Sequence, residues 1–321
     1  MTRPGLRDDL EQVPHGRTAR RLAWRFLPPQ LRHEVERRLG SPVVDAVSRD
    51  AGFTPGFASV LTGEDGSQVF VKAANMQAQA DFARAYLAAA TKIAALPEGV
   101  PAPRLLWIHE DESWVALGFE VIDGRPPKRP WRPTELERAL DLAELIADAT
   151  DPVPLELGLR PILEDVPGLA TAWERVPDGP HRAEALALAT AYAALPATAF
   201  CHSDLRDDNV LLTADAAYAV DWNWPALAQP WQDTVDLLVS AYGDGLDVEA
   251  IVAERRLTRD VDPDHIDGWL AALCGYMEEM CARPAPSSSP YLRVHGRWYA
   301  EALWGWLSER RGWDLGESGA R

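Results

Sequence analysis

The sequence is poor in cysteine and contains no long apolar stretch. Its three cysteines are odd in number and lack the paired spacing of metal ligands, which indicates reduced thiols rather than a disulfide framework. No run of about eighteen apolar residues is present, which argues against a membrane span. The N-terminal residues lack the apolar core of a secretory signal. We therefore expect a cytoplasmic protein, with residues 1–22 as a flexible segment ahead of the folded part.

Lysine is also scarce, and the 49 acidic residues outnumber the 32 basic ones, which gives a formal net charge of −17. Such acidity argues against nucleic acid or an anionic membrane as a partner, because both carry phosphates. An acidic cleft could attract a cationic small molecule, but acidity spread over the whole surface accounts for the same total equally well. Of the 32 basic residues, all but Lys72, Lys92 and Lys128 are arginine.

Lys72 is notable because it lies inside the short apolar run 69–73, which reads as a strand. An ammonium on a flexible stem acts as a point charge for phosphate oxygens. A lysine that only extends from a half-buried strand would fit the same pattern. Upstream, the strand-like residues 43–48 lead into a glycine-containing loop.

That loop contains Gly52 and Gly56 and runs into a second strand at Ser59. Glycine allows backbone amides to approach phosphate oxygens closely, although glycines at this spacing also occur in ordinary turns. A turn at 63–67 then leads to the lysine strand. This order predicts a hairpin that folds a phosphate-covering loop over the lysine.

The strongest pattern is the run HSDLRDDN at residues 202–209, followed by two short apolar runs and Asp221. The runs 210–212 and 218–220 read as strands joined by a polar turn. If they pair antiparallel, Asn209 and Asp221 become neighbours, with the loop before them close by.

Two oxygen ligands and a nearby carboxylate, here Asn209, Asp221 and Asp204, are what Mg²⁺-dependent phosphoryl transfer requires. The cation neutralises phosphate oxygens, and the carboxylate accepts a proton from the attacking hydroxyl. An isolated loop aspartate would more often cap a helix or shape a turn. The conjunction of all three with strand, turn and strand favours the catalytic interpretation.

With these motifs the chain resembles the aminoglycoside phosphotransferases and their choline-kinase-like relatives, which share the protein-kinase fold. The resemblance covers residues 40–310 approximately. It implies an α+β, two-lobe, protein-kinase-like fold. Residues 23–122 would form a nucleotide-binding lobe of antiparallel sheet and helix, and residues 123–321 a mainly helical lobe with the catalytic loop, the metal site and acceptor-binding helices.

The resemblance also implies roles for individual residues. Asp204 would be the catalytic base, and Asn209 and Asp221 would hold Mg²⁺. His202 and Asp233 would support the catalytic loop structurally. ATP would be bound through phosphate contacts of the lysine and glycine loop and through main-chain contacts to adenine at the hinge 119–124. The residues implied for ATP are Lys72, Gly52, Gly56, Ser59, Glu120 and Ile122.

One departure from the family pattern concerns the helix after the lysine strand. The family pairs its lysine with a helix glutamate, whereas this chain has Ala89 or a neighbouring alanine there. Either Lys72 finds another partner, such as Asp221, or nucleotide binding is weakened. The second case would make the protein a catalytically weak or inactive nucleotide-binding protein. A protein kinase is disfavoured because no Asp-Phe-Gly or Ala-Pro-Glu signature is present.

The larger lobe is predicted to be mostly helical, and it would hold the acceptor. The expected helices are 134–149, 181–195, 232–242, 247–255, 264–281 and 291–309. Acidic side chains could contact amines of the acceptor, although for each one taken alone a solvated helix charge is the better explanation. These candidates are Asp236, Asp244, Asp247, Glu278 and Glu279. We therefore expect ATP-dependent phosphorylation of a small-molecule hydroxyl, on an aminoglycoside, an amino sugar or a related natural product.

Overall fold

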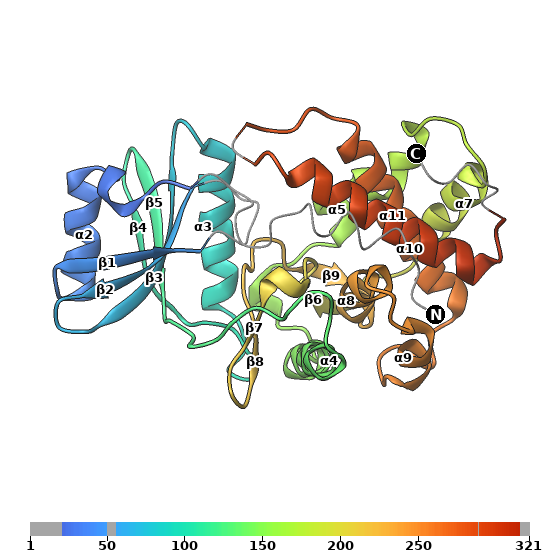
Figure 1. Ribbon diagram of the computed structural model, residues 1–321, viewed down its shortest axis with the longest axis horizontal. Coiled ribbons are helices and arrows are strands. Elements are labelled where there is room, and N and C mark those ends of the chain that lie inside the picture. The colour runs from blue at the N-terminus through green and yellow to red at the C-terminus, as the bar shows by residue number, and fades with distance from the viewer. Residues whose placement is uncertain (1–20, 50–55, 288, 315–321) are drawn as a thin grey trace.

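The computed structural model describes residues 21–49, 56–287 and 289–314, which form two lobes side by side (Figure 1). The segment predicted to be flexible, residues 1–22, lies almost entirely outside the described residues. The lobe boundary that we placed after residue 122 stays a prediction. Main chain around this position leads from the last strand of the sheet lobe into the helical lobe.

The smaller lobe is built on one antiparallel sheet with the strand order β1-β2-β3-β5-β4. Its strands are β1 (Val43–Ser48), β2 (Phe57–Gly63), β3 (Gln68–Asn75), β4 (Leu105–Glu110) and β5 (Trp114–Phe119). Strands β2 and β3 pair from Phe57 opposite Ala73, across the turn predicted at 63–67. The strands predicted around the glycine loop and the lysine are therefore confirmed.

Each face of this sheet packs against a different helix. Val69 and Val71 of β3 lie in the core shared with α2 (Pro29–Leu39), whereas Ala74 lies in the core shared with α3 (Ala80–Ala94). This follows from the two-residue repeat of a strand. In Figure 1, α2 covers the outer face and α3 stands on the face toward the helical lobe. Even-numbered side chains of β3 therefore point toward the second lobe.

All six helices predicted for the larger lobe are confirmed, with ends displaced by at most two residues. They are α4 (Pro133–Ala149), α7 (Arg182–Ala193), α8 (Gln232–Gly243), α9 (Val248–Glu254), α10 (Pro263–Cys281) and α11 (Leu292–Arg311). Their starts carry recognisable signals. Proline occupies the first position of α10, and the Asp262 side chain accepts a hydrogen bond from the Asp264 amide.

The two strands expected at 210–212 and 218–220 are present as β7 (Val210–Leu212) and β8 (Ala217–Ala219), the second displaced by one residue. The other short elements were not predicted, because three or four residues show no periodicity. The helical ones are η1 (Trp24–Phe26), η2 (Leu155–Leu157), α5 (Ile162–Asp165), α6 (Gly168–Thr171), η3 (Ala172–Glu174) and η4 (Asp207–Asn209). Two small antiparallel pairs complete the lobe, β6 (Ala199–Cys201) with β9 (Ala226–Ala228) and β7 with β8.

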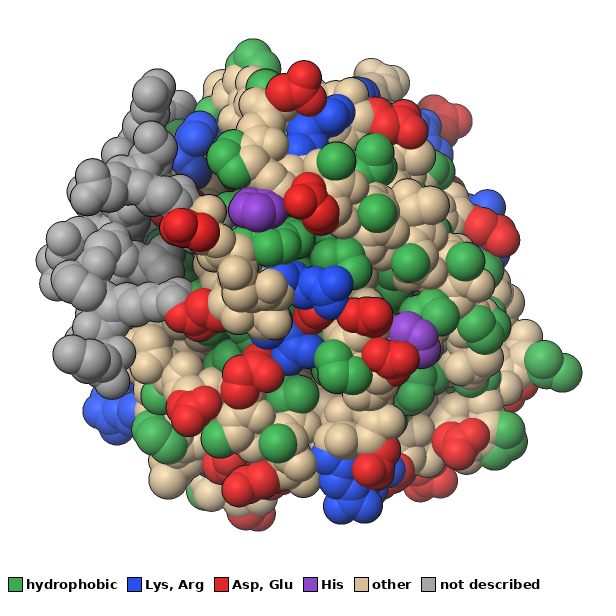
Figure 2. All heavy atoms as spheres, turned by 90° about the vertical axis from the view of Figure 1, so that its right-hand side faces the viewer, with side chains coloured by type: hydrophobic (Ala, Val, Ile, Leu, Met, Phe, Trp, Pro, Cys, Tyr) green, Lys and Arg blue, Asp and Glu red, His purple; other side chains and the backbone are tan. Residues whose placement is uncertain are grey.

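The core of the helical lobe is aromatic. Trp298 and Trp306 of α11 are buried, and Trp269 of α10 belongs to the same cluster. Among the described residues, every helix is too short or too polar to cross a bilayer. Figure 2 shows the end of the helical lobe, where acidic and basic side chains are interspersed with apolar ones. On this face the negative charge is distributed rather than gathered.

Gly118 of β5 is a sensitive position, because the Trp107 ring covers it. A Cβ at residue 118 would lie 2.1 Å from the Trp107 Cε2 atom. Gly118→Ala should therefore destabilise the protein by about 1–3 kcal/mol, as expected for overpacking. Gly179→Ala is the matched control, since a Cβ there meets nothing within 4 Å. Urea unfolding of both variants checks this, and equal midpoints for the two would contradict it.

Candidate active site

The catalytic-loop candidates are brought together by the β7–β8 hairpin. Val210 pairs with Ala219, and the Val220 amide donates to the Asn209 carbonyl at 2.9 Å. The antiparallel pairing predicted from the sequence is thus present, and it places Asn209 beside Asp221. The Asn209 side-chain amide donates to the Asp204 carbonyl at 2.8 Å and to the Asp204 carboxylate at 3.1 Å. All three residues therefore share one corner of the structure.

Two residues of this corner have strained backbones. Ser203 has φ 63° and Asp221 has φ 66°, the left-handed region that non-glycine residues rarely adopt. Such strain persists only where surrounding contacts fix it. Asp233, in the first turn of α8, accepts hydrogen bonds from the amides of His202 and Ser203 at 2.7 and 2.9 Å. These contacts hold the loop in the conformation that presents Asp204.

His202, at the start of the 202–209 loop, contacts the main chain just before Asp221. It is fully buried, and burial lowers the pKa of its imidazole, so the ring is neutral at pH 7. Its Nε2 lies 3.0 Å from the Val220 carbonyl, which assigns the proton to Nε2. The ring packs 4.4 Å from that of Trp222. These contacts position the chain before Asp221 and give His202 no route to a substrate.

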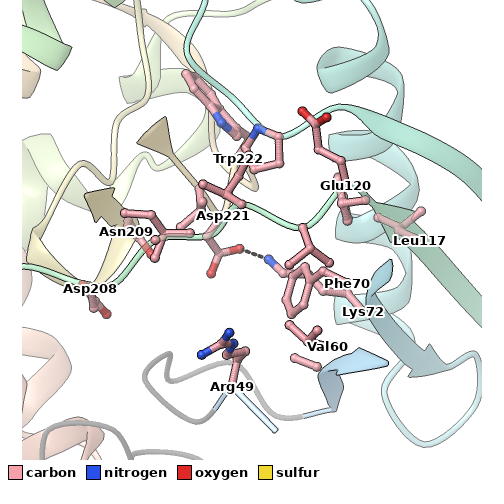
Figure 3. Close-up of a pocket in the computed structure, with 18 of the residues that line it drawn as sticks. Arg49, Val60, Phe70, Lys72, Leu117, Glu120, Asp208, Asn209, Asp221 and Trp222 are labelled. Atoms are coloured by element: carbon pink, nitrogen blue, oxygen red, sulfur yellow. Dashed lines mark hydrogen bonds and ion pairs between the residues drawn. The ribbon is translucent and has the colours of Figure 1, made fainter. Parts of the chain in front are cut away.

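Lys72 reaches across from the sheet lobe to Asp221, as Figure 3 shows. Its Nζ donates to Asp221 Oδ1 at 2.5 Å. Burial alone would raise the pKa of Asp221, but the adjacent Lys72 ammonium outweighs it, and the net shift is downward. Asp221 is therefore ionised at pH 7. The partner that we suggested for Lys72 is the one it contacts.

Helix α3 faces Lys72 with an aromatic ring instead of a carboxylate. The ammonium lies 5.9 Å from the centroid of the Tyr86 ring, within the range of cation–π attraction. Ala89, one turn further along α3, is 1 % exposed and lines the same cavity as Lys72. Ala89, one of the alanines considered for the position opposite the lysine, therefore contributes only a methyl group to the cavity wall.

These groups border a cavity of about 350 Å³ between the lobes. Lys72, Glu120, Ile122, Asn209 and Asp221 line it. Its apolar walls come from both lobes and are formed by Ala58, Val60, Phe70, Leu117, Phe119, Leu211 and Val220.

The hinge residues Glu120 and Ile122 line this cavity. The Glu120 amide donates to the Arg104 carbonyl at 3.0 Å. Within the part of the chain that the structure describes, the Glu120 carbonyl and the Ile122 amide have no hydrogen-bond partner. An acceptor and a donor two residues apart can bind the edge of a flat heteroaromatic ring.

The glycine-loop candidates are placed differently. Gly52 lies outside the described residues. Gly56 has φ 131°, and a Cβ there would lie 3.0 Å from the Ala73 carbonyl, so a close approach within the sheet requires glycine. Ser59 does not line the cavity. Ala58 and Val60 do, and the alternation of β2 turns Ser59 to the α2 face.

A second cavity, of about 610 Å³, lies on the other side of the catalytic loop. Ser203, Asp204 and Arg206 border it, and Asn223 borders both cavities. Burial raises the pKa of Asp204 in spite of Arg206, whose Nε lies 3.3 Å from its carboxylate. Asp204 thus faces one cavity while Asn209 and Asp221 face the other.

Sequence reasoning missed several polar residues of the site. Asp208 lines the first cavity, and burial, with help from neighbouring carboxylates, raises its pKa to about 7. Arg206 Nε lies 3.3 Å from both the Asp204 and the Asp208 carboxylate. Asn223 donates to Asp221 at 2.5 Å. The signal that could have revealed the first two was present, a single arginine enclosed by three aspartates in the loop.

Arg129 was also missed, and it connects the loop to α8. It is buried and bonds Asp207 at 2.8 Å and Asp244 at 2.7 Å. Asp244 is therefore occupied in the protein interior rather than available to an acceptor. The Trp131 amide donates to the same carboxylate at 2.6 Å. This network fixes the residues after the hinge against the catalytic loop.

Of the five acidic residues considered for acceptor binding, only Asp236 lines the second cavity. Asp247 caps α9 by accepting from the Ala250 amide. Glu279 pairs with Arg175 and Arg283. Glu278 borders neither cavity.

Three solved structures are similar over most of the chain. A spectinomycin phosphotransferase with ADP and spectinomycin has 13% identity and a TM-score of 0.59, covering 88% of this chain and 98% of its own. A thermostable mutant of an aminoglycoside phosphotransferase with AMP-PNP and hygromycin B has 13% identity and a TM-score of 0.59, covering 90% and 100%. A choline/ethanolamine kinase family protein from Mesorhizobium loti has 16% identity and a TM-score of 0.50, covering 87% and 94%.

At these identities the similarity establishes the fold, and the predicted two-lobe, protein-kinase-like α+β fold is confirmed. No curated protein sequence matches the chain. A family model described as the phosphotransferase enzyme family matches residues 51–269, which is more than half of the chain. The motifs around Lys72 and Asp204, the fold and this match agree, and the chain belongs to the phosphotransferase enzyme family.

Proposed function

We propose that the protein transfers the γ-phosphate of ATP to a hydroxyl group of a small molecule. The observation that carries the proposal is the pair of cavities that meet at the catalytic loop. Lys72, Asn209 and Asp221 border one, and Asp204 borders the other. A phosphate donor in the first cavity and a hydroxyl in the second would meet at the loop, which is the positioning that phosphoryl transfer needs.

The first cavity suits a nucleoside triphosphate. The free Glu120 carbonyl and Ile122 amide would bind adenine, between apolar walls that include Val60 and Leu117. Lys72 would contact the phosphates. Related structures bound to ADP and to AMP-PNP support ATP as the donor.

Asn209 and Asp221 would hold Mg²⁺. Among the described residues, no group of three or more His, Cys, Asp or Glu side chains forms a metal site. A nucleotide-borne Mg²⁺ does not need one, because phosphates and water supply most of its ligands. The ionised Asp221 carboxylate and the Asn209 amide oxygen are the hard donors that it prefers. When bound, the cation would neutralise charge on the phosphates.

Asp204 would act as the base for the acceptor hydroxyl. It borders the acceptor cavity, and the Asn209 amide and Arg206 hold its carboxylate in place. His202 and Asp233 would support the loop through the contacts described above. Asp204 must be ionised to accept a proton, so turnover should fall as the pH falls through its raised pKa.

The rival function is a nucleotide-binding protein with little or no turnover, which the missing α3 carboxylate favours. An ATP-consumption screen over aminoglycosides, amino sugars and other small alcohols with Mg²⁺, run beside thermal shift with ATP, separates the two. Stabilisation by ATP without turnover for any acceptor would support the rival.

Asp204→Asn should lower turnover by about 10²-fold or more, because a positioned proton acceptor is lost. Binding of ATP should remain nearly intact, since Asp204 lies on the acceptor side. Steady-state kinetics with a verified acceptor checks this, with Asp215→Asn in the exposed β7–β8 turn as the control. An undiminished rate in Asp204→Asn would remove the base assignment.

Asp221→Ala should abolish the Mg²⁺-dependent thermal stabilisation by ATP, whereas Asn209→Ala should only weaken it. The reason is that only the carboxylate brings negative charge to the cation. Thermal shift with ATP, with and without saturating Mg²⁺, measures both. An ATP-induced shift in Asp221→Ala equal to that of the wild type would count against the metal site.

Ala89→Glu should tighten ATP binding, because the new carboxylate enters the cavity wall beside Lys72. The gain should be smaller than the roughly 0.5–1 kcal/mol of an exposed ion pair, because Ala89 is 1 % exposed and burial of the larger side chain costs stability. The control is Ala90→Glu, since Ala90 is buried in the core under α3 and a carboxylate there has no partner. That variant should lose stability instead. Titration of ATP by calorimetry tests the first variant, and weaker binding than wild type would refute the expected pairing.

A further inference from the structure

The second cavity shows which kind of acceptor the proposed kinase would take. Its wall is largely aromatic and aliphatic. On one side it is formed by α10 and α11, and the residues there are Trp269, Leu273, Tyr276, Met277 and Tyr299. Ile162 and Leu169, from the short helices α5 and α6, face them. Burying apolar ligand surface against such a wall contributes about 25 cal/mol per Å².

The carboxylates of this cavity already have partners. Asp165 pairs with Arg160. Asp204 lies 3.3 Å from Arg206, as noted above. Asp236 is 4 % exposed and accepts from the Trp269 indole at 2.7 Å. Burial raises the pKa of Asp236 well above its usual range, so its charge is suppressed as well.

The cations that line the cavity outnumber the ionised carboxylates that line it. Lys92 Nζ donates to the Pro225 carbonyl at 3.0 Å, a neutral acceptor, and burial lowers the pKa of Lys92 although Asp165 opposes the shift. Arg206 lies beside Asp208 as well as Asp204. With Arg160 and Arg206, three cationic side chains line the cavity, against Asp165 and Asp204 as its ionised carboxylates. A ligand with several ammonium groups would meet these cations and would have to displace existing ion pairs. Such a mismatch disfavours it.

We infer that the acceptor is an alcohol with an apolar face and no cationic groups, and not a polycationic aminoglycoside. Its apolar face would lie against Trp269, Leu273 and Met277, with a hydroxyl directed to Asp204. This inference rests on the proposed function in taking the second cavity as the acceptor site. Of the two explanations left open for the acidity of the chain, it does not need an acidic cleft that attracts a polycation.

Two probes test the inference by saturation-transfer NMR in the presence of ATP analogue and Mg²⁺. Phenyl β-D-glucoside is uncharged, with an aromatic face and hydroxyls, and kanamycin A is a polycation. Phenyl glucoside should show saturation transfer and kanamycin should show none. Transfer to kanamycin would overturn the inference, and so would the absence of transfer to both probes.

A matched pair of variants tests whether phenyl glucoside binds in the second cavity. Met277→Glu puts a carboxylate into the cavity wall, whereas Leu155→Glu puts one at a surface position that is 94 % exposed. Met277→Glu should weaken phenyl glucoside binding by about tenfold or more, equivalent to about 1.4 kcal/mol, and Leu155→Glu should not change it. Equal affinities in the two variants would contradict the assigned wall.

Thermal shift with ATP and Mg²⁺ is run on the same samples. If ATP fails to stabilise the wild type, the proposed function fails, whatever the probes do. If ATP stabilises it and kanamycin binds, only the acceptor class is wrong. Met277→Glu must keep the ATP shift of the wild type, because the first cavity does not include residue 277.

Discussion

The ion pair between Lys72 and Asp221 is the interaction on which the site depends. It joins a strand of the sheet lobe to the end of the β7–β8 hairpin, and it is only 15 % and 21 % exposed. Partial burial makes both charges costly unless they face each other, so loss of either partner would leave an unpaired charge in the cleft.

In this chain the ion pair also replaces the contact that a helix carboxylate would make with the lysine. With alanine at position 89, α3 supplies no carboxylate, and the lysine is held by Asp221 and the face of Tyr86. The carboxylate that would hold a cation therefore also holds the lysine. Binding of a metal nucleotide must redistribute these contacts.

The loop opposite the lysine is held in a strained conformation by buried groups. Ser203 and Asp221 both have left-handed backbones, and Asp233 and His202 supply the hydrogen bonds that keep them there. Strain of this kind costs about 1–3 kcal/mol per residue and persists where neighbours over-determine it. The result is that Asp204 faces one cavity while Asn209 and Asp221 face the other.

Local patterns were sufficient for the parts of the structure that repeat. The long helices follow from apolar periodicity and capping residues, and the proximity of Asn209 and Asp221 follows from one antiparallel hairpin. Other features depend on which distant side chains meet. Ser59 was assigned to the nucleotide, but a strand reverses its side-chain direction at each residue, and Ser59 turns to the α2 face. The contact of Arg129 with Asp207 and Asp244 joins residues far apart in the chain, and no local pattern encodes it.

The charge around a cavity likewise cannot be predicted from local sequence patterns. A net charge of −17 left open whether the cleft or the whole surface is acidic, because charge near a cavity is determined by pairing and burial. The composition favours pairing, because nearly all the basic residues are arginine, whose planar fork bonds carboxylates at two points. Arg255 bonds Glu137 and Asp141, and Arg310 bonds Glu249 and Asp267.

Inside the second cavity, Arg160 pairs with Asp165 and Arg206 pairs with Asp204. Each ionised carboxylate that lines the second cavity already has an arginine beside it. The acidity of the whole chain therefore does not make this cavity acidic, and its aromatic wall and Lys92 are the features that would suit the uncharged, apolar-faced alcohol inferred above.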